Sequence, residues 1–248
     1  DRKASGDLVA PIFNGWTPNV DGSVTMLFGF ANRNREEIVD IPLGPNNYIE
    51  PAQFDGAQPT HFPVYNRGGF IGINERGAFA VTVPADMAGT EVVWTLKHAG
   101  YEYSVPGRAT STTYEMSDGE RALGSLAPAI RFELDGAEST TREGITAARV
   151  TASVGNPVNL SAYVQDRGNR ADYPEQAKLL FYPLTTDWVM HQGSAAPDFE
   201  RSLTLDVDRA AEGISQLSAD DWIHVQTMAT FSEPGEYIIR LRASNFAA

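Results

Sequence analysis

The stretch NRNREE, residues 32–37, places two amides, two guanidinium groups and two carboxylates directly after an apolar run. Such groups can exchange protons, bind anions or form hydrogen bonds with a partner. Glu36 and Glu37 are adjacent, and adjacent residues of a strand point to opposite faces, which is a poor arrangement for a catalytic pair. Because Asn and Arg side chains also bond to neighbouring backbone, the stretch is expected to lock a strand crossover, with docking of a partner protein as the alternative.

The four histidines give no metal-binding motif. The four residues are His61, His98, His191 and His224, which lie far apart in the sequence. None of them belongs to an HxH, HxxxH or HExxH motif, the spacings typical of metal sites. The chain has no cysteine, which excludes thiolate catalysis, cysteine-type zinc sites and iron–sulfur clusters. His61 is therefore expected in a structural or surface role.

Other signatures of catalysis are missing from the sequence, which contains no GxSxG motif, no P-loop and no GxGxxG motif. Carboxylates number 32, so their count leaves a glycosidase-like pair open. A second group of carboxylates is expected to form a solvated acidic face rather than a calcium site, because the order of ligands in an EF-hand is absent. These residues are Asp206, Asp208, Glu212, Asp220 and Asp221. The sequence predicts no catalytic residue, no metal and no cofactor, and an unrecognised hydrolase stays as one alternative.

Aromatic and arginine side chains gather in or beside the expected loops. Exposed rings could stack on sugars or anchor a protein, whereas buried rings would fill the core. Core filling is the structural interpretation, and a protein interface is the functional one that the mixture of Asn, Arg and aromatic residues favours. The predicted partner-binding residues are Trp16, Arg33, Arg35, Tyr48, His61, Phe62, Tyr65 and Arg67.

The elements that would position these residues are mostly strands. Val24, Met26, Phe28 and Phe30 alternate with other residues and share one face, which is the period of a β-strand. Further strands are expected at 37–44, 77–84, 90–107 with a turn near Gly100, 128–136, 150–168 with a turn at 155–157, 177–184, 188–193 and 229–245. Only residues 208–222 have a pattern that could form a short helix. The many short strands predict an all-β fold of two β-sandwich domains in tandem, each immunoglobulin- or fibronectin-like.

The expected domain organisation follows composition. An N-terminal β-sandwich domain covers 1–115 and contains a long irregular loop, 44–77, rich in Pro, Gly and Asn. A small polar linker occupies 116–125, and a C-terminal immunoglobulin-like domain covers 126–248. The loop 44–77 is the part of the N-terminal domain where a binding surface is expected.

The net charge of −13 limits the classes of partner that the chain is expected to bind. So acidic a surface repels nucleic acid and anionic membranes and suits a basic protein partner. No stretch is apolar for long enough to span a membrane. The chain begins at Asp1, which is consistent with a removed signal peptide, so a periplasmic or extracellular location is expected.

Two pieces of the C-terminal half, VTASVGNPVNLSAYVQDRG and ATFSEPGEYIIRLRASN, carry a resemblance. They resemble the opening pair of strands and the closing hairpin of immunoglobulin-like modules of the PKD and cadherin-like kind. That resemblance implies a sandwich fold. In such a fold Tyr237 would start the last strand and pin a corner through its hydroxyl.

The N-terminal half is similar to uncharacterised exported bacterial proteins in GWTPNVDGSVTMLFGFANRNREE, AQPTHFPVYNRGGF and FAVTVPADM. This similarity suggests accessory subunits of membrane complexes, including photosynthetic reaction-centre assemblies. The predicted function is therefore that of a non-catalytic periplasmic or extracytoplasmic protein that braces a larger envelope complex. A carbohydrate-binding module and an unrecognised hydrolase are the alternatives.

Overall fold

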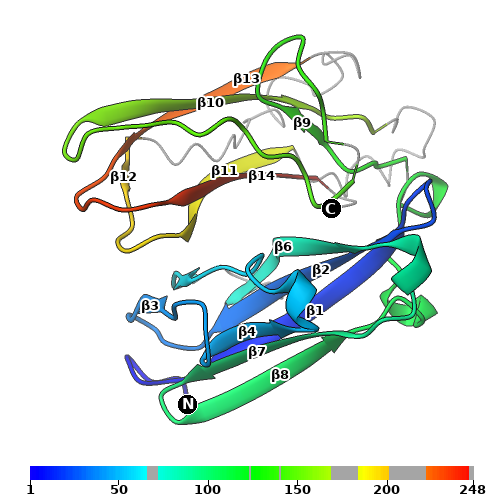
Figure 1. Cartoon of the computed structure of the whole chain (residues 1–248), viewed down its shortest axis with the longest axis horizontal. Coiled ribbons are helices and arrows are strands. Elements are labelled where there is room, and N and C mark those ends of the chain that lie inside the picture. Colours follow the sequence, from blue (N-terminus) through cyan, green and yellow to red (C-terminus); the bar gives the residue numbers. More distant parts are fainter. Residues whose placement is uncertain (66–71, 123, 140, 169–183, 201–221, 246–248) are drawn as a thin grey trace. The chain divides into compact units, whose positions relative to one another are not determined.

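The computed structural model describes residues 1–65, 72–122, 124–139, 141–168, 184–200 and 222–245. The chain forms two compact units, Asp1–Met116 with Thr141–Glu143 and Ser117–Thr140 with Gly144–Ala248. Each unit is described by itself (Figure 1).

The described secondary structure is all-β apart from four short 3-10 turns. In unit 1 the elements are β1 Val9–Pro18, β2 Val24–Asn32, β3 Val39–Asp40, β4 Asn47–Glu50, η1 Ala52–Phe54, β5 His61–Phe62, β6 Asn74–Val83, η2 Ala85–Met87, β7 Val92–His98, β8 Tyr101–Gly107 and η3 Thr112–Tyr114. In unit 2 they are η4 Glu120–Ala122, β9 Ala129–Arg131, β10 Pro157–Gln165, β11 Thr185–Gln192, β12 Asp198–Phe199, β13 Ile223–Thr230 and β14 Ile238–Ser244.

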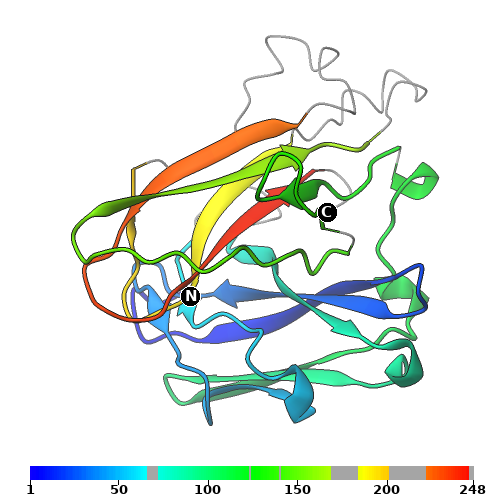
Figure 2. The ribbon, with the colours of Figure 1, turned by 45° about the horizontal axis from the view of Figure 1, so that its top comes forward.

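Unit 1 has two three-stranded sheets, ordered β1-β2-β6 and β4-β7-β8, and a short ribbon of β3 and β5. All of the pairings between these described strands are antiparallel. Figures 1 and 2 show the two larger sheets as separate layers of this unit. Their inward side chains form one core, which includes the expected alternating face of β2 from Val24 to Phe30.

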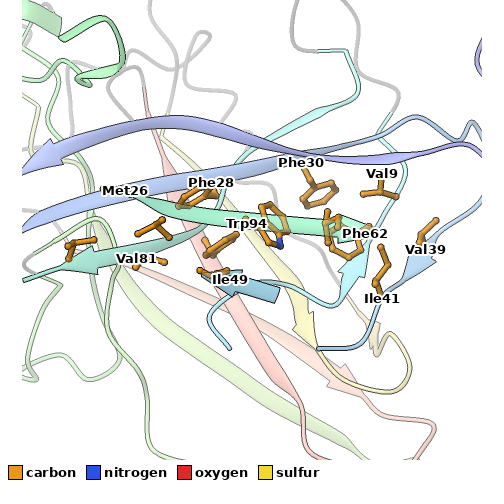
Figure 3. Close-up of a cluster of buried hydrophobic side chains, with 14 of the residues drawn as sticks. Val9, Met26, Phe28, Phe30, Val39, Ile41, Ile49, Phe62, Val81 and Trp94 are labelled. Atoms are coloured by element: carbon orange, nitrogen blue, oxygen red, sulfur yellow. The ribbon is translucent and has the colours of Figure 1, made fainter. Parts of the chain in front are cut away.

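A cluster of aromatic rings lies in the core of unit 1 among aliphatic side chains (Figure 3). Trp94 of β7 is fully buried, and its ring centroid lies 4.9 Å from that of Phe79 and 6.3 Å from that of Phe62. Phe62 in turn meets Phe30 edge to face at 5.0 Å. Edge-to-face aromatic pairs of this kind add about 1 kcal/mol each beyond the area that they bury, so β5 is held firmly against the sheets.

The described strands of unit 2 also form two sheets, ordered β12-β13-β10-β9 and β11-β14. Its core takes side chains from both sheets, among them Val164, Trp188, Val225 and Leu241. The closing hairpin expected from the sequence does not form: β13 ends at Thr230 and β14 begins at Ile238, but β13 pairs with β10 and β12, whereas β14 pairs with β11 in the other sheet.

The structure differs from the sequence predictions in several elements. Strand β1 was not predicted, because Pro11 and a bulge at Phe13–Gly15 interrupt its alternation. The strand expected at 128–136 ends at Arg131, because the N–H of Gly136 donates to the Glu133 carbonyl and turns the chain. The first half of the stretch 150–168 forms no described strand. The helix expected at 208–222 and most of the strand expected at 177–184 lie outside the described residues.

Candidate functional site

The stretch NRNREE holds the N-terminal segment of the chain in place. Asn32 and Asn34 are fully buried. The Asn32 side-chain amide donates to the carbonyls of Glu37 and Phe62, both at 2.9 Å. Asn34 donates to the Asp7 carbonyl at 3.1 Å and accepts from the Asp7 N–H at 2.7 Å. These asparagines therefore do the structural work expected of the stretch, because they satisfy buried backbone groups at the end of β2.

The two arginines of the stretch share this arrangement through their backbones. The N–H of Arg33 donates to the Leu8 carbonyl, and the N–H of Arg35 donates to the Lys3 carbonyl, each at 3.0 Å. The Arg33 Nε lies 3.8 Å from the Asp7 Oδ1, and the Arg35 side chain is exposed. Because these backbone N–H groups are already bonded, a partner can contact the two arginines only through their side chains.

Asp7 is the anionic centre of this segment. The backbone N–H groups of Lys3 and Leu8 donate to its carboxylate and hold the pKa of Asp7 below its ordinary value of 3.8, with a smaller contribution from the nearby Arg33 guanidinium. Hydrogen bonds to the charged form favour that form. The segment is therefore tied down by an ionised carboxylate at neutral pH.

A third buried asparagine, Asn47, organises the loop that the sequence predicts to be irregular. Its side-chain nitrogen donates to the carbonyls of Ile41 and Pro59 at 2.9 and 2.8 Å, and its Oδ1 accepts from the Trp94 indole at 3.0 Å. The fully buried Gln58 donates to the Asn47 carbonyl at 3.2 Å. One side chain thus ties three segments of the chain together, so much of 44–62 is ordered by buried polar contacts.

His61 and Asp40 form one residue pair of the β3–β5 ribbon, next to Val39 and Phe62. The His61 Nδ1 lies 2.7 Å from the Asp40 Oδ1, with the imidazole buried and the carboxylate half exposed. The N–H of Ile41 donates to the Thr60 carbonyl at 2.9 Å, which extends the ribbon by one bond. Through this contact the His61 side chain takes part in the structure of the ribbon.

Exposed apolar side chains lie next to the ribbon along the chain. Val39 and Ile41 point into the core beside Phe62 (Figure 3), so Ile38 and Pro42, one residue away from them, face outward, and Leu43 is exposed just after the strand. Ile38 is 54% exposed and Leu43 is 41% exposed. We call Ile38, Pro42, Leu43 and Pro45 the ribbon row; both prolines are also exposed.

Charged side chains flank the ribbon row. Arg35, Glu36 and Asp40 are exposed next to it along the chain. An apolar centre with a charged rim is the composition of a protein-binding surface. The buried side chains of Asn32 and Asn47 donate hydrogen bonds to the backbone carbonyls of Glu37 and Ile41, next to the ribbon row. The backbone of the row is therefore held in one conformation before a partner binds.

The eight predicted partner-binding residues do not form one site. Trp16 lies seven residues along β1 from Val9, which is about 23 Å in a strand, and Val9 pairs with Asn32 at the opposite end. The Trp16 ring packs against the core, and its indole donates to the Ser111 carbonyl at 2.9 Å. Tyr48 of β4 is half-buried, with the Lys97 Nζ 5.8 Å from its ring centroid.

Three more predicted residues lie near one another in the chain. Phe62 is fully buried, so its ring belongs to the core and offers a partner no surface. The Tyr65 ring packs against the same core, 6.3 Å from Phe30. Arg67 lies outside the described residues.

Sequence reasoning missed the buried amides Asn47 and Gln58 and the exposed Ile38 and Leu43. One signal for Ile38 was present: Ile38 and Val39 are adjacent, and two adjacent aliphatic residues of a strand cannot both face the core. No local signal marks Asn47, because its partners come from segments distant in sequence.

The described residues contain no group of three or more His, Cys, Asp or Glu side chains placed to hold a metal ion. The acidic residues weighed for calcium, Asp206 to Asp221, lie outside the described part. Over the ranges described, no helix has the length and apolar character to cross a membrane.

Comparisons of the chain with protein-family models, with curated proteins and with solved structures found no match.

Proposed function

We propose that this chain is a non-catalytic binding protein that docks another protein through the ribbon row of unit 1. The observation that carries the proposal is the exposure of Ile38 and Leu43 on backbone fixed from behind by buried asparagines. Rigid backbone lowers the entropy lost on binding, and aliphatic side chains gain free energy when a partner covers them. The predicted anchors Arg35 and Arg33 flank the row and supply polar contacts.

The partner is proposed to be a protein with a basic patch. The chain carries a net charge of −13, which raises the rate of encounter with a positively charged surface. The rings of Trp16 and Tyr65 pack against the core, which leaves them little free face to stack on a sugar and favours a protein partner over a carbohydrate.

The finer fold assignment belongs to the same proposal. Both units are proposed to be immunoglobulin- or fibronectin-like sandwiches in tandem. In unit 2 the Tyr237 hydroxyl donates to the Glu233 carbonyl at 2.9 Å, four residues upstream, as a tyrosine corner does. Trp188 on β11 is buried, as is the tryptophan of strand C in that fold.

The location and the complex follow from the resemblances of the sequence. The chain is proposed to be exported to the periplasm or cell exterior and to act as an accessory subunit of a membrane-bound complex, with photosynthetic or electron-transfer complexes as the first candidates. Surface complementarity is the mechanism: the ribbon row is covered, and the flanking charges fix the orientation.

The test compares matched surface variants. Tagged chains carrying Ile38→Asp with Leu43→Asp, or Val20→Asp as control, are purified gently from envelope fractions of the source cells. Val20 is an exposed aliphatic residue in the turn between β1 and β2. Equal melting temperatures establish that all of the chains fold.

The wild-type and Val20→Asp chains should retain the same stoichiometric partner, and the double variant should lose it. Burial of each row side chain contributes about 1.4 kcal/mol, or tenfold in Kd, so the double change weakens binding about a hundredfold or more. Retention of the partner by the double variant would refute the site, and a native chain that purifies alone would refute the function.

A further inference from the structure

Strand β14 has one open edge among the described residues. Ile238–Ser244 pairs antiparallel with β11, and no other described strand pairs with it. Among the described strands of unit 2, the other sheet has four and this one has two. An open edge presents unpaired N–H and C=O groups, which form a template for another strand.

The two faces of β14 differ in chemistry. Ile239, Leu241 and Ala243 point into the core of unit 2, and Arg240 and Arg242 stand on the opposite face. A strand added at this edge would extend the core with one face and meet two guanidinium groups with the other. Apolar and acidic residues in alternation match both faces.

Of the two arginines, Arg240 would be stabilised more than Arg242 by an acidic side chain of a partner. The Arg242 Nη2 lies 2.7 Å from the Asp187 Oδ2 directly across the ladder. Arg240 stands opposite Val189 instead. Its Nη1 is buried without a hydrogen-bond partner among the described residues, and burial lowers the pKa of this guanidinium to about 10. A carboxylate beside it would offset the cost of that burial.

Exposed aliphatic residues lie close to the start of the same strand. Residues 144–156 form no described strand, and Val150 and Val154 are 60% and 50% exposed. The Arg149 Nη1 lies 2.7 Å from the Glu236 Oε1, two residues before β14 begins. This segment therefore adds uncovered apolar surface near the edge.

We propose that the open edge of β14 binds an extended strand of a partner protein in which apolar and acidic residues alternate. The strand pairs through its backbone, places its apolar side chains against the core rim at Leu241, and places a carboxylate beside Arg240. A second copy of β14 is a poor occupant. Antiparallel pairing centred on Leu241 sets Arg240 of one copy opposite Arg242 of the other, and like charges in that position repel.

The proposal goes beyond docking at the ribbon row and stands on different residues. Its test uses the full chain and a synthetic seven-residue probe, acetyl-Thr-Val-Glu-Val-Glu-Val-Thr-amide. Backbone amide exchange over 238–244 is measured by NMR with and without the probe. One control peptide carries Lys in place of Glu, and another carries N-methyl groups on alternate amides.

The Glu peptide should slow exchange of the edge amides of β14 at least tenfold at saturation. The Lys peptide should bind at least tenfold more weakly, and the N-methylated peptide should not bind. Arg240→Gln should reduce the preference for the Glu peptide over the Lys peptide, with an unchanged melting temperature as the check on folding.

Four outcomes would overturn the proposal. These are no slowing at millimolar peptide, equal binding of the N-methylated peptide, β14 edge amides already protected in the free chain, and a concentration-dependent dimer that protects them. The third would show that this chain already fills the edge, and the fourth that a second copy does.

Discussion

Asn47 offers the sharpest test of how the candidate site is built. Substitution by Ala removes the two donors that reach the Ile41 and Pro59 carbonyls and the acceptor used by the Trp94 indole. The side chain is fully buried, so water does not replace these bonds. Three buried polar groups lose their partner in one change.

The magnitude follows from the number of groups left unpaired. A buried polar group without a partner costs about 1–3 kcal/mol. Three such groups, with some relaxation of the chain around them, give a loss of about 4 kcal/mol in the free energy of unfolding. That is a large share of the roughly 5–15 kcal/mol that holds an ordinary domain folded.

The assay is urea denaturation followed by tryptophan fluorescence. Hydrogen exchange over Val92–His98 assigns the loss to unit 1, because β7 carries the Trp94 bond. Asn46→Ala is the matched control: Asn46 is exposed and contributes its backbone carbonyl, which the substitution keeps. Its effect should stay within about 0.5 kcal/mol.

Asn47→Asp separates donors from acceptor. The carboxylate keeps an oxygen for the Trp94 indole but faces the Ile41 and Pro59 carbonyls without a proton. At neutral pH the Asp variant should therefore be at least as unstable as the Ala variant. A loss below about 1 kcal/mol for Asn47→Ala would refute the reasoning that this side chain holds the loop.

Two further predictions concern the N-terminal segment and unit 2. The pKa of Asp7 is lowered by the N–H groups of Lys3 and Leu8, so its stabilising contribution is complete above its ordinary pKa of 3.8 and is lost as the pH falls through the lower folded value. NMR amide signals of residues 2–8 should therefore shift toward unfolded positions only in that acid range. Tyr237→Phe removes the hydroxyl bonds to the Glu233 carbonyl and Ser194 Oγ, and urea denaturation should show a loss of about 1 kcal/mol.

Each of these two has its own control. Asp7→Asn should remove the acid transition of the N-terminal signals, and a transition of unchanged size would assign it to another group. Tyr163→Phe is the matched control for Tyr237→Phe. The Tyr163 ring stacks on His224, and its hydroxyl makes no hydrogen bond within the described residues. Equal losses for the two tyrosines would argue against the corner.

Much of the fold was predictable because strand patterns are local. The alternation of Val24, Met26, Phe28 and Phe30 marked β2, and the apolar positions around Gly100 marked the β7–β8 hairpin. Strand β1 was missed since a bulge moves its pattern by one residue between Phe13 and Gly15. The two-residue β3 could not be bounded, because its extent depends on which backbone groups β5 brings to it.

The candidate site was much less predictable than the strands. The sequence pointed to NRNREE and to the loop that follows, and the structural interpretation of the asparagines agrees with their bonds. It also grouped Trp16 with Phe62, although the first lies at the far end of β1 and the second is in the core. Spacing in sequence does not report which side of a short ribbon is covered.

The sequence by itself determined the all-β character, the acidic charge of −13 and the absence of cysteine chemistry. These properties depend on composition and on side chains two residues apart, which any single sequence displays. Only the tertiary structure decided that Asn47 joins Ile41, Pro59 and Trp94, and that Ile38 faces outward. Those facts depend on contacts between residues distant in the chain, and a buried amide looks the same in sequence as an exposed one.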